Sequence, residues 1–131
     1  MKRMSKCYEL VIYTASLSKY ADPVLDFLDK EKYCAYWLFR EHCTFFNGIF
    51  VKDLSRLDRD LENSIIIDNS PTSYFFHTEC ALPITSWYDD PNDDELTWLI
   101  PILESLSRVD DVRNYIKLFV FEDKVHFAKA A

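Results

Sequence analysis

Short apolar runs alternate along this chain with more polar segments that have helical spacing. The first run, residues 8–14, is β-rich and almost continuously apolar, which is typical of a strand that helices cover on both faces of a parallel sheet. A helix is expected to follow, with Ser16 or Ser18 as its cap and Pro23 near its start. Its buried face is predicted to consist of Val24, Leu25 and Leu28.

A hairpin is predicted over residues 43–52, where Asn47-Gly48 separates two apolar runs. Both positions of a two-residue hairpin turn require a positive φ, which Asn and Gly adopt more easily than other residues. Residues 53–62, which follow, are expected to form a short polar helix or a loop.

Two more strands and a second helix are predicted in the remainder of the chain. Residues 64–68 form the second buried strand, and residues 81–84 a shorter one in which Pro83 favours a sheet edge or a strand end. The apolar run 96–103 follows an acidic stretch, and acidic side chains complement the dipole at a helix N-terminus. A calcium site is the alternative, disfavoured by the missing glycine of an EF-hand loop. The acidic residues are Asp89, Asp90, Asp93, Asp94 and Glu95.

This alternation of strands and helices over 131 residues indicates a single α/β domain, residues 1–131, in which helices sandwich a parallel sheet. Ligands of such sheets bind outside the carboxyl ends of the strands. Thr14 and Asp68 follow two predicted strands, so we expect both at that edge.

Composition narrows the classes of partner. The net charge of −7 disfavours direct contact with nucleic acid, whose phosphates would repel the surface. A single glycine excludes the glycine-rich loops that cradle nucleotide phosphates. No run approaches the ~18 apolar residues of a membrane span, and the start has no signal-like apolar stretch. We therefore expect an intracellular protein, nuclear or cytoplasmic.

The four cysteines are expected to be reduced and mostly to act as small core side chains. None forms a Cys-x-x-Cys pair, and no regular spacing links them to His42, His77 or His126 as zinc sites require. They are Cys7, Cys34, Cys43 and Cys80.

Four residues at strand ends could form a phosphate site. Thr14 could donate to a phosphoryl oxygen, and Lys52 could neutralise its charge. Asp68 and Asn69 offer the oxygen ligands that Mg²⁺ prefers. Taken singly, each also has an ordinary structural role, as a strand-end hydroxyl, a solvated strand terminus or the opening of a turn.

A resemblance supports the phosphate site. Residues 13–23, Tyr-Thr-Ala-Ser-Leu-Ser-Lys-Tyr-Ala-Asp-Pro, resemble the second signature block of the small carboxy-terminal-domain phosphatases. These are Mg²⁺-dependent protein serine phosphatases of the haloacid dehalogenase superfamily, related to the nuclear LIM interactor-interacting factors. The resemblance covers about residues 8–113 and leaves 114–131 as a C-terminal extension. It continues through residues 38–41, 51–57, 67–71 and 86–90, and more loosely through 106–113.

The resemblance implies a mechanism and a set of roles. In that family a strand-end aspartate attacks the phosphate and forms an aspartyl-phosphate that water then hydrolyses. By resemblance, Thr14 binds the phosphoryl group, Lys52 stabilises its charge, and Asp68 and Asn69 hold Mg²⁺. The substrate is a phosphoprotein, typically the RNA polymerase II C-terminal tail. Residues that would contact it are Leu17 in an apolar pocket, with Tyr20 and Arg40 against the phosphopeptide.

The family's D-x-D-x-T block, which carries the nucleophile on a central strand, does not occur in these residues. Asp58-Arg59-Asp60 has the spacing but follows no apolar strand, and residues 68–72 replace the second aspartate with Ser70. We therefore expect an N-terminally incomplete phosphatase domain that is inactive alone. A chain without that central strand is expected to self-associate or to need a partner that supplies a strand. The alternatives are a non-catalytic phosphopeptide-binding or scaffolding module, and a decayed sequence without activity.

Overall fold

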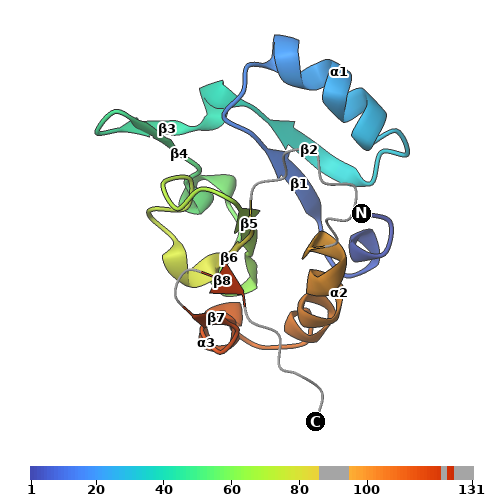
Figure 1. Ribbon diagram of the computed structural model, residues 1–131, viewed down its shortest axis with the longest axis vertical. Helices are drawn as coiled ribbons and strands as arrows, with labels where there is room; N and C mark the ends of the chain where they lie inside the picture. The colour runs from blue at the N-terminus through green and yellow to red at the C-terminus, as the bar shows by residue number, and fades with distance from the viewer. Residues whose placement is uncertain (86–94, 122–123, 126–131) are drawn as a thin grey trace. The chain divides into compact units, whose positions relative to one another are not determined.

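The computed structural model describes residues 1–85, 95–121 and 124–125 (Figure 1). The chain divides into two compact units, Met1–Lys52 and Asp53–Ala131, and each is described by itself. The expectation of one domain over the whole chain stays a prediction.

The first unit is built on a strand–helix–strand motif. Strands β1 (Leu10–Tyr13) and β2 (Cys34–Leu38) pair in parallel, and helix α1 (Ser18–Leu28) connects them and lies alongside the pair (Figure 1). A parallel pair needs a crossover connection of this kind, because its two strands start at the same edge. The strand predicted at residues 8–14 is therefore confirmed as part of a parallel pair, although its residues are half-buried rather than buried. A short 3₁₀ helix, η1 (Met4–Lys6), precedes β1.

Helix α1 differs from its prediction at its cap and on its buried face. Leu17 occupies the N-cap position and makes no side-chain cap hydrogen bond, so the predicted caps Ser16 and Ser18 were wrong. Pro23 lies inside the helix rather than at its start. The buried residues are Ala21 and Leu25, whereas Val24 and Leu28 are more than half exposed.

Asp29 joins the end of α1 to the start of β2. Its buried carboxylate accepts hydrogen bonds from the backbone N–H groups of Tyr33 (2.8 Å) and Cys34 (3.3 Å) and from the indole N–H of Trp37 (3.1 Å). Burial alone would raise the pKa of Asp29, but the hydrogen bonds from Trp37, Tyr33 and Cys34 lower it below its ordinary value. A buried carboxylate is tolerated here because donors surround it.

The first unit continues with a 3₁₀ turn and a hairpin. The turn η2 (Arg40–His42) leads into β3 (Thr44–Phe46) and β4 (Ile49–Val51), which pair antiparallel around a two-residue turn. Asn47 has φ 48° and Gly48 has φ 81°, so both turn positions are left-handed as predicted. In such a hairpin the turn twist matches the twist of the flanking strands.

The second unit holds another parallel pair. Two 3₁₀ helices, η3 (Leu54–Leu57) and η4 (Leu61–Asn63), replace the predicted polar helix or loop. Strands β5 (Ile66–Asp68) and β6 (Ala81–Pro83) then pair in parallel, with Pro83 at the end of its strand, and η5 (Thr78–Cys80) lies directly before β6. An apolar core beside this pair is formed by Leu54, Ile66, Tyr74, Cys80 and Ala81, with Leu57 and Leu61 packed against them.

Two helices and a short antiparallel pair complete the second unit. Helix α2 (Glu95–Leu106) contains Pro101 in its interior, and α3 (Val112–Ile116) packs against η4 and η5. Strands β7 (Val120–Phe121) and β8 (Lys124–Val125) pair antiparallel, and β8 lies next to β6. The predicted acidic stretch 89–94 lies outside the described residues, and α2 begins at the last acidic residue, Glu95.

The protein is thus a mixed α/β protein with small parallel and antiparallel sheets. Among residues 1–85, 95–121 and 124–125, every sheet has two strands. A continuous parallel sheet sandwiched by helices, and a first strand missing from it, stay predictions. In the same residues, no helix has both the length and the apolar character needed to cross a bilayer.

The turn of the β3–β4 hairpin gives a stability test. Gly48→Ala should lower the free energy of unfolding by about 1–2 kcal/mol, because an alanine Cβ is strained at φ 81° although no atom lies within 4 Å of its position. Gly48→Asn should lose less, since asparagine tolerates this backbone conformation. Urea unfolding of the three chains measures the difference. Equal loss in both variants would contradict this account of the turn.

Candidate active site

Thr14 lies directly after β1, at the carboxyl end of the parallel pair. Its backbone N–H donates to Leu38 O (2.9 Å), which extends the pairing with β2 by one residue. Its hydroxyl oxygen accepts from Ser16 N–H (3.1 Å), a local turn that threonine commonly stabilises. Because that oxygen acts as an acceptor, the hydroxyl hydrogen of Thr14 is available to donate to a ligand oxygen.

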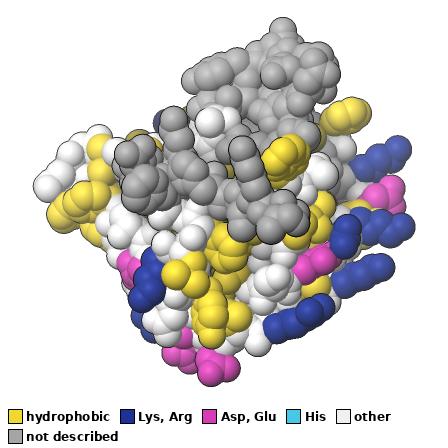
Figure 2. Space-filling model, turned by 60° about the horizontal axis from the view of Figure 1, so that its bottom comes forward, with side chains coloured by type: hydrophobic (Ala, Val, Ile, Leu, Met, Phe, Trp, Pro, Cys, Tyr) yellow, Lys and Arg dark blue, Asp and Glu magenta, His cyan; other side chains and the backbone are white. Residues whose placement is uncertain are grey.

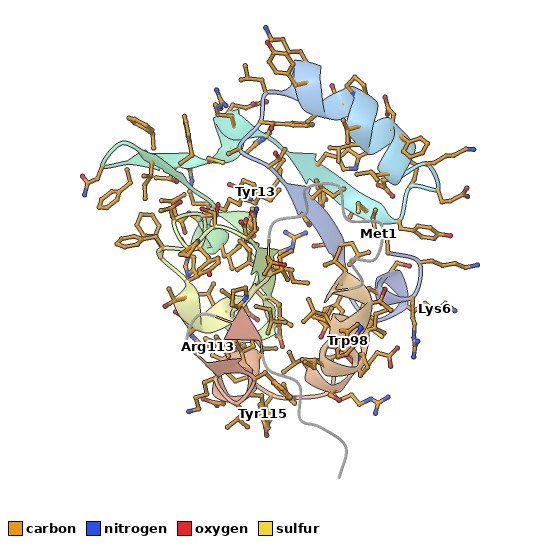
Figure 3. The ribbon with its side chains drawn as sticks, in the orientation of Figure 1. Met1, Lys6, Tyr13, Trp98, Arg113 and Tyr115 are labelled. Carbon is orange, nitrogen blue, oxygen red and sulfur yellow. The ribbon has the colours of Figure 1, made fainter. Side chains whose placement is uncertain are left out.

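Arg40 is attached to the same loop from the end of β2. Its side-chain Nε–H donates to Ala15 O (2.7 Å), and its backbone N–H donates to Ser16 O (3.1 Å). The adjoining residues are held as well, since Tyr13, whose side chain is labelled in Figure 3, donates its hydroxyl hydrogen to His42 O. The structure therefore brings Thr14, predicted to bind the phosphoryl group, and Arg40, predicted to contact the phosphopeptide, to one end of the β1–β2 pair.

The two other predicted substrate residues of the first unit lie where α1 begins. Leu17 is the N-cap residue and Tyr20 lies in the first turn, and both side chains are exposed. Lys19 Nζ lies 4.9 Å from the centre of the Tyr20 ring, a cation–π distance. An apolar pocket at Leu17 stays a prediction.

Lys52 ends the first unit, one residue after β4. It follows the fully buried Val51 and is itself only 9% exposed. The sequence left open a solvated strand terminus at this position, and that alternative was wrong. A buried ammonium group is retained only where oxygen atoms or opposite charges compensate its lost hydration.

Asp68 and Asn69 lie in the second unit, at the carboxyl end of β5. Asp68 is buried, its Oδ1 accepts from Ser70 N–H (2.9 Å), and its backbone carbonyl accepts from Ile84 N–H (3.1 Å). Asn69 is exposed. The strand thus ends in a local turn closed by the Asp68 carboxylate, and its buried carboxylate is followed in the sequence by an exposed amide side chain.

The donor chemistry at Asp68 and Asn69 suits Mg²⁺, which binds a few protein oxygens and keeps several waters. These two residues would supply at most a partial ligand set. Among the described residues, no three His, Cys, Asp or Glu side chains gather into a group that could hold a metal ion.

The cysteines are free, and they do not share one environment. Cys80 belongs to the core, Cys34 and Cys43 are half-buried, and Cys7 is exposed. Burial raises the pKa of both Cys34 and Cys80 to about 11, with a smaller contribution from the nearby carboxylates of Asp29 and Glu79 respectively. Both thiols are therefore protonated at neutral pH and are poor nucleophiles.

A partly buried hydrogen bond, which the sequence did not predict, joins His77 to Asp53. His77 Nε2–H donates to Asp53 Oδ1 (2.9 Å), because an ionised carboxylate can only accept. The same oxygen accepts from Ser55 N–H (3.0 Å) and Ser55 Oγ–H (2.6 Å) and so caps η3. Asp53-x-Ser55 is a recognisable cap signal, but no local sequence pattern predicts that His77, 24 residues away, also bonds to Asp53.

This bond fixes the loop that follows Asp68 and Asn69. His77 is 6% exposed, and its Nδ1 has no hydrogen-bond partner among the described residues. Burial would raise the pKa of Asp53, but the hydrogen bonds from His77 and Ser55 lower it below its ordinary value. The ionised carboxylate of Asp53 therefore holds the loop, through His77, at the start of η3.

Comparison with known proteins identifies relatives of the chain. A sequence model of NLI interacting factor-like phosphatases matches residues 1–113. A Dictyostelium discoideum protein named probable C-terminal domain small phosphatase is 56% identical over 113 residues, covering 86% of this chain and 37% of the relative.

Two mammalian relatives show similar identity. The mouse carboxy-terminal domain RNA polymerase II polypeptide A small phosphatase 2 is 55% identical over 112 residues, covering 86% of this chain and 42% of the relative. The human small phosphatase 1 of the same name is 53% identical over 117 residues, covering 89% and 45%. The chain thus spans less than half the length of each of these relatives.

The Asp53–His77 bond predicts a specific loss of stability in acid. The lowered pKa of Asp53 stabilises the folded chain above the ordinary aspartate pKa of about 4, and this contribution is lost as the pH falls through the folded-state pKa. Asp53→Asn keeps an acceptor oxygen without the charge. It should cost about 1–2 kcal/mol at pH 7, and the difference should shrink below about pH 4.

Urea unfolding between pH 7 and pH 3 measures this effect. Asp58→Asn is the matched control, since Asp58 is exposed, caps the other end of η3 and has a left-handed backbone that asparagine also adopts. Parallel stability curves for the wild-type and Asp53→Asn chains would show that the charge of Asp53 contributes nothing to stability.

Proposed function

Since the chain belongs to the NLI interacting factor-like phosphatase family, we propose that it forms the phosphate- and metal-handling part of a Mg²⁺-dependent protein serine/threonine phosphatase of the aspartyl-phosphate type. The observation that carries this proposal is that Arg40 donates hydrogen bonds to Ala15 and Ser16, the two residues that follow Thr14, at the carboxyl end of the β1–β2 pair. The substrate would be an intracellular phosphoprotein, for which the RNA polymerase II tail in the relatives' names is the model.

Thr14 and Arg40 together suit a phosphoryl group. The Thr14 hydroxyl can donate one hydrogen bond, and the Arg40 guanidinium retains its two terminal nitrogens while Nε is occupied by Ala15 O. A planar guanidinium donates two parallel hydrogen bonds to two phosphate oxygens. The hydrogen bond from Arg40 Nε to Ala15 O restricts the guanidinium before phosphate binds, which lowers the reorganisation that binding requires.

The remaining predicted residues are proposed to handle the charge of the phosphoryl group and of the metal ion. They are Lys52, Asp68 and Asn69. The Lys52 ammonium would stabilise the transferring phosphoryl group, as positioning and charge neutralisation dominate phosphoryl transfer. Asp68 and Asn69 would hold Mg²⁺, which when bound supplies positive charge for phosphate oxygens. Asp53 and His77 would keep the loop beyond Asn69 in place.

The nucleophile is proposed to come from a D-x-D-x-T segment that is not among these 131 residues. Asp58-Arg59-Asp60 remains a poor substitute, since Asp58 ends the 3₁₀ helix η3 rather than a strand. Without the nucleophile, these residues would bind a phosphorylated peptide but not hydrolyse it. Thr14 and Arg40 need neither metal nor nucleophile to bind phosphate, which is what favours the second candidate function, a non-catalytic phosphopeptide-binding or scaffolding module.

Phosphopeptide binding by the purified chain tests the phosphate site. Arg40→Ala and Thr14→Val should each weaken binding of a fluorescent phosphoserine peptide, measured by anisotropy, by about tenfold or more, because each removes donors to the phosphate. Lys30→Ala is a control, since it removes an exposed positive charge from the same unit, beyond the opposite end of α1. If both site variants bind as tightly as the wild-type chain, Thr14 and Arg40 do not form the phosphate site.

Turnover separates the two candidate functions. The 131-residue chain should release no phosphate from an aryl phosphate in the presence of Mg²⁺, because no aspartate is placed as the nucleophile. Release of phosphate that Asp68→Ala abolishes would contradict this prediction. A longer form containing a D-x-D-x-T strand should be active under the same conditions if the chain is part of a phosphatase, and inactive if it is part of a binding module.

A further inference from the structure

The outer face of the β3–β4 hairpin presents two phenylalanines to solvent. Phe45 and Phe50 are direct cross-strand partners, and their ring centres lie 5.2 Å apart. Phe45 is 67% exposed and Phe50 is 36% exposed. In the space-filling view, hydrophobic side chains reach the surface at the left, where Figure 1 places the hairpin tip (Figure 2).

The alternation of the two strands places this pair away from the core. Neighbouring residues on a strand point to opposite faces, and the next pair along the hairpin contains Val51, which has no exposed surface. Val51 and its partner Thr44 therefore lie on the inner face, and Phe45 and Phe50 on the outer one. Contact with water is unfavourable in free energy for an aromatic pair on an outer face unless a partner covers it. Exposed apolar patches commonly mark interaction sites.

Arg40 adds a fixed positive charge to this aromatic pair. Its Cζ lies 5.2 Å from the centre of the Phe50 ring, within the range of a cation–π contact. Because Nε donates to Ala15 O, the guanidinium is held from two sides, and within the described part of the chain its two terminal nitrogens donate to no other group. The outer hairpin face and the phosphate-handling loop therefore share one side chain.

We propose that Phe45, Phe50 and Arg40 form a single docking surface, the aromatic platform, for an aromatic side chain that flanks the phosphoserine of a peptide substrate. This inference rests on the proposed phosphate site and names the substrate class of that site. The phosphate would bind Arg40 and Thr14, and the flanking ring would pack on Phe45 and Phe50. Stacked aromatic pairs contribute beyond the area they bury, so the flanking residue would set specificity.

Charge favours this occupant over two others. A cationic peptide would be repelled by Arg40, whereas a phosphorylated one is attracted. A second copy is disfavoured because a two-fold contact through the platform would place two Arg40 side chains against each other. An anionic, aromatic peptide complements both components of the surface.

Peptide binding by the purified chain tests the platform. The probes are a fluorescent phosphoserine peptide with a phenylalanine two residues away on either side, the same peptide with both phenylalanines replaced by alanine, and the unphosphorylated form of each. The wild-type chain should bind the phenylalanine phosphopeptide about tenfold more tightly than the alanine one. Phe45→Thr and Phe50→Thr keep a strand-forming residue and should remove most of this preference.

Phe27→Ala is the matched control, because Phe27 is an 80% exposed phenylalanine of the same unit that lies on α1. It should leave the preference unchanged. Circular dichroism of each variant verifies that the chain is folded, and Phe45→Leu, which keeps an apolar side chain of similar size, should retain part of the preference.

The outcomes separate the platform from the phosphate site. If Arg40→Ala abolishes binding of both phosphopeptides while Phe45→Thr and Phe50→Thr bind like the wild-type chain, the phosphate site stands and the platform is wrong. If the preference for phenylalanine depends on Phe45 and Phe50 but not on the phosphate, the platform stands and the phosphate site is wrong. Concentration-dependent dimers that Phe50→Thr dissociates, seen in sedimentation, would assign the surface to self-association and overturn the proposal.

Discussion

The parallel pairing of β1 with β2 is the constraint on which the candidate site of the first unit depends. Parallel strands end at the same edge, so the loop after β1 and the turn after β2 must meet there although 25 residues separate Ala15 from Arg40. Thr14 extends the ladder by one hydrogen bond to Leu38, and Arg40 then reaches across to Ala15. Thr14 and Arg40 therefore lie at the same end of the pair, held there by backbone pairing and by one side-chain hydrogen bond.

Local patterns predicted the features that depend on local energetics. Asn47-Gly48 predicted the hairpin because few other residues adopt two successive positive φ angles. The apolar run at residues 64–68 predicted β5. Strand β2 was missed because Cys34–Leu38 acquires its role from pairing with β1 and from the buried Asp29 that holds its start. The cap at Leu17 and the bond from His77 to Asp53 were missed for the same reason, since tertiary contacts overrode or replaced the local signal.

The second unit also has a parallel strand pair with predicted site residues at its carboxyl end, but these residues carry a carboxylate and an amide. Strand β5 ends at Asp68, opposite Pro83 at the end of β6. The loop that follows Asn69 is held by the hydrogen bond from His77 to the ionised Asp53. Two-stranded pairs of three to five residues are marginal on their own in water, and what stabilises this one is the apolar core of Leu54, Ile66 and Tyr74 beside it. A strand supplied by a partner or by a second copy, as proposed from the sequence, would add ladder hydrogen bonds to these short pairs.

The hydrogen bond from Arg40 Nε to Ala15 has a consequence for how this position can vary in evolution. One nitrogen of the guanidinium, Nε, donates to Ala15 O and so fixes the loop, which leaves the two terminal nitrogens for a ligand. Lysine has three donors on a single terminal nitrogen, so it cannot hold the loop through one nitrogen and present two parallel donors from two others. Replacing Arg40 by lysine would keep the positive charge but would weaken either the hydrogen bond to the loop or the binding of the ligand. A relative with lysine at this position should therefore need a second residue to retain both.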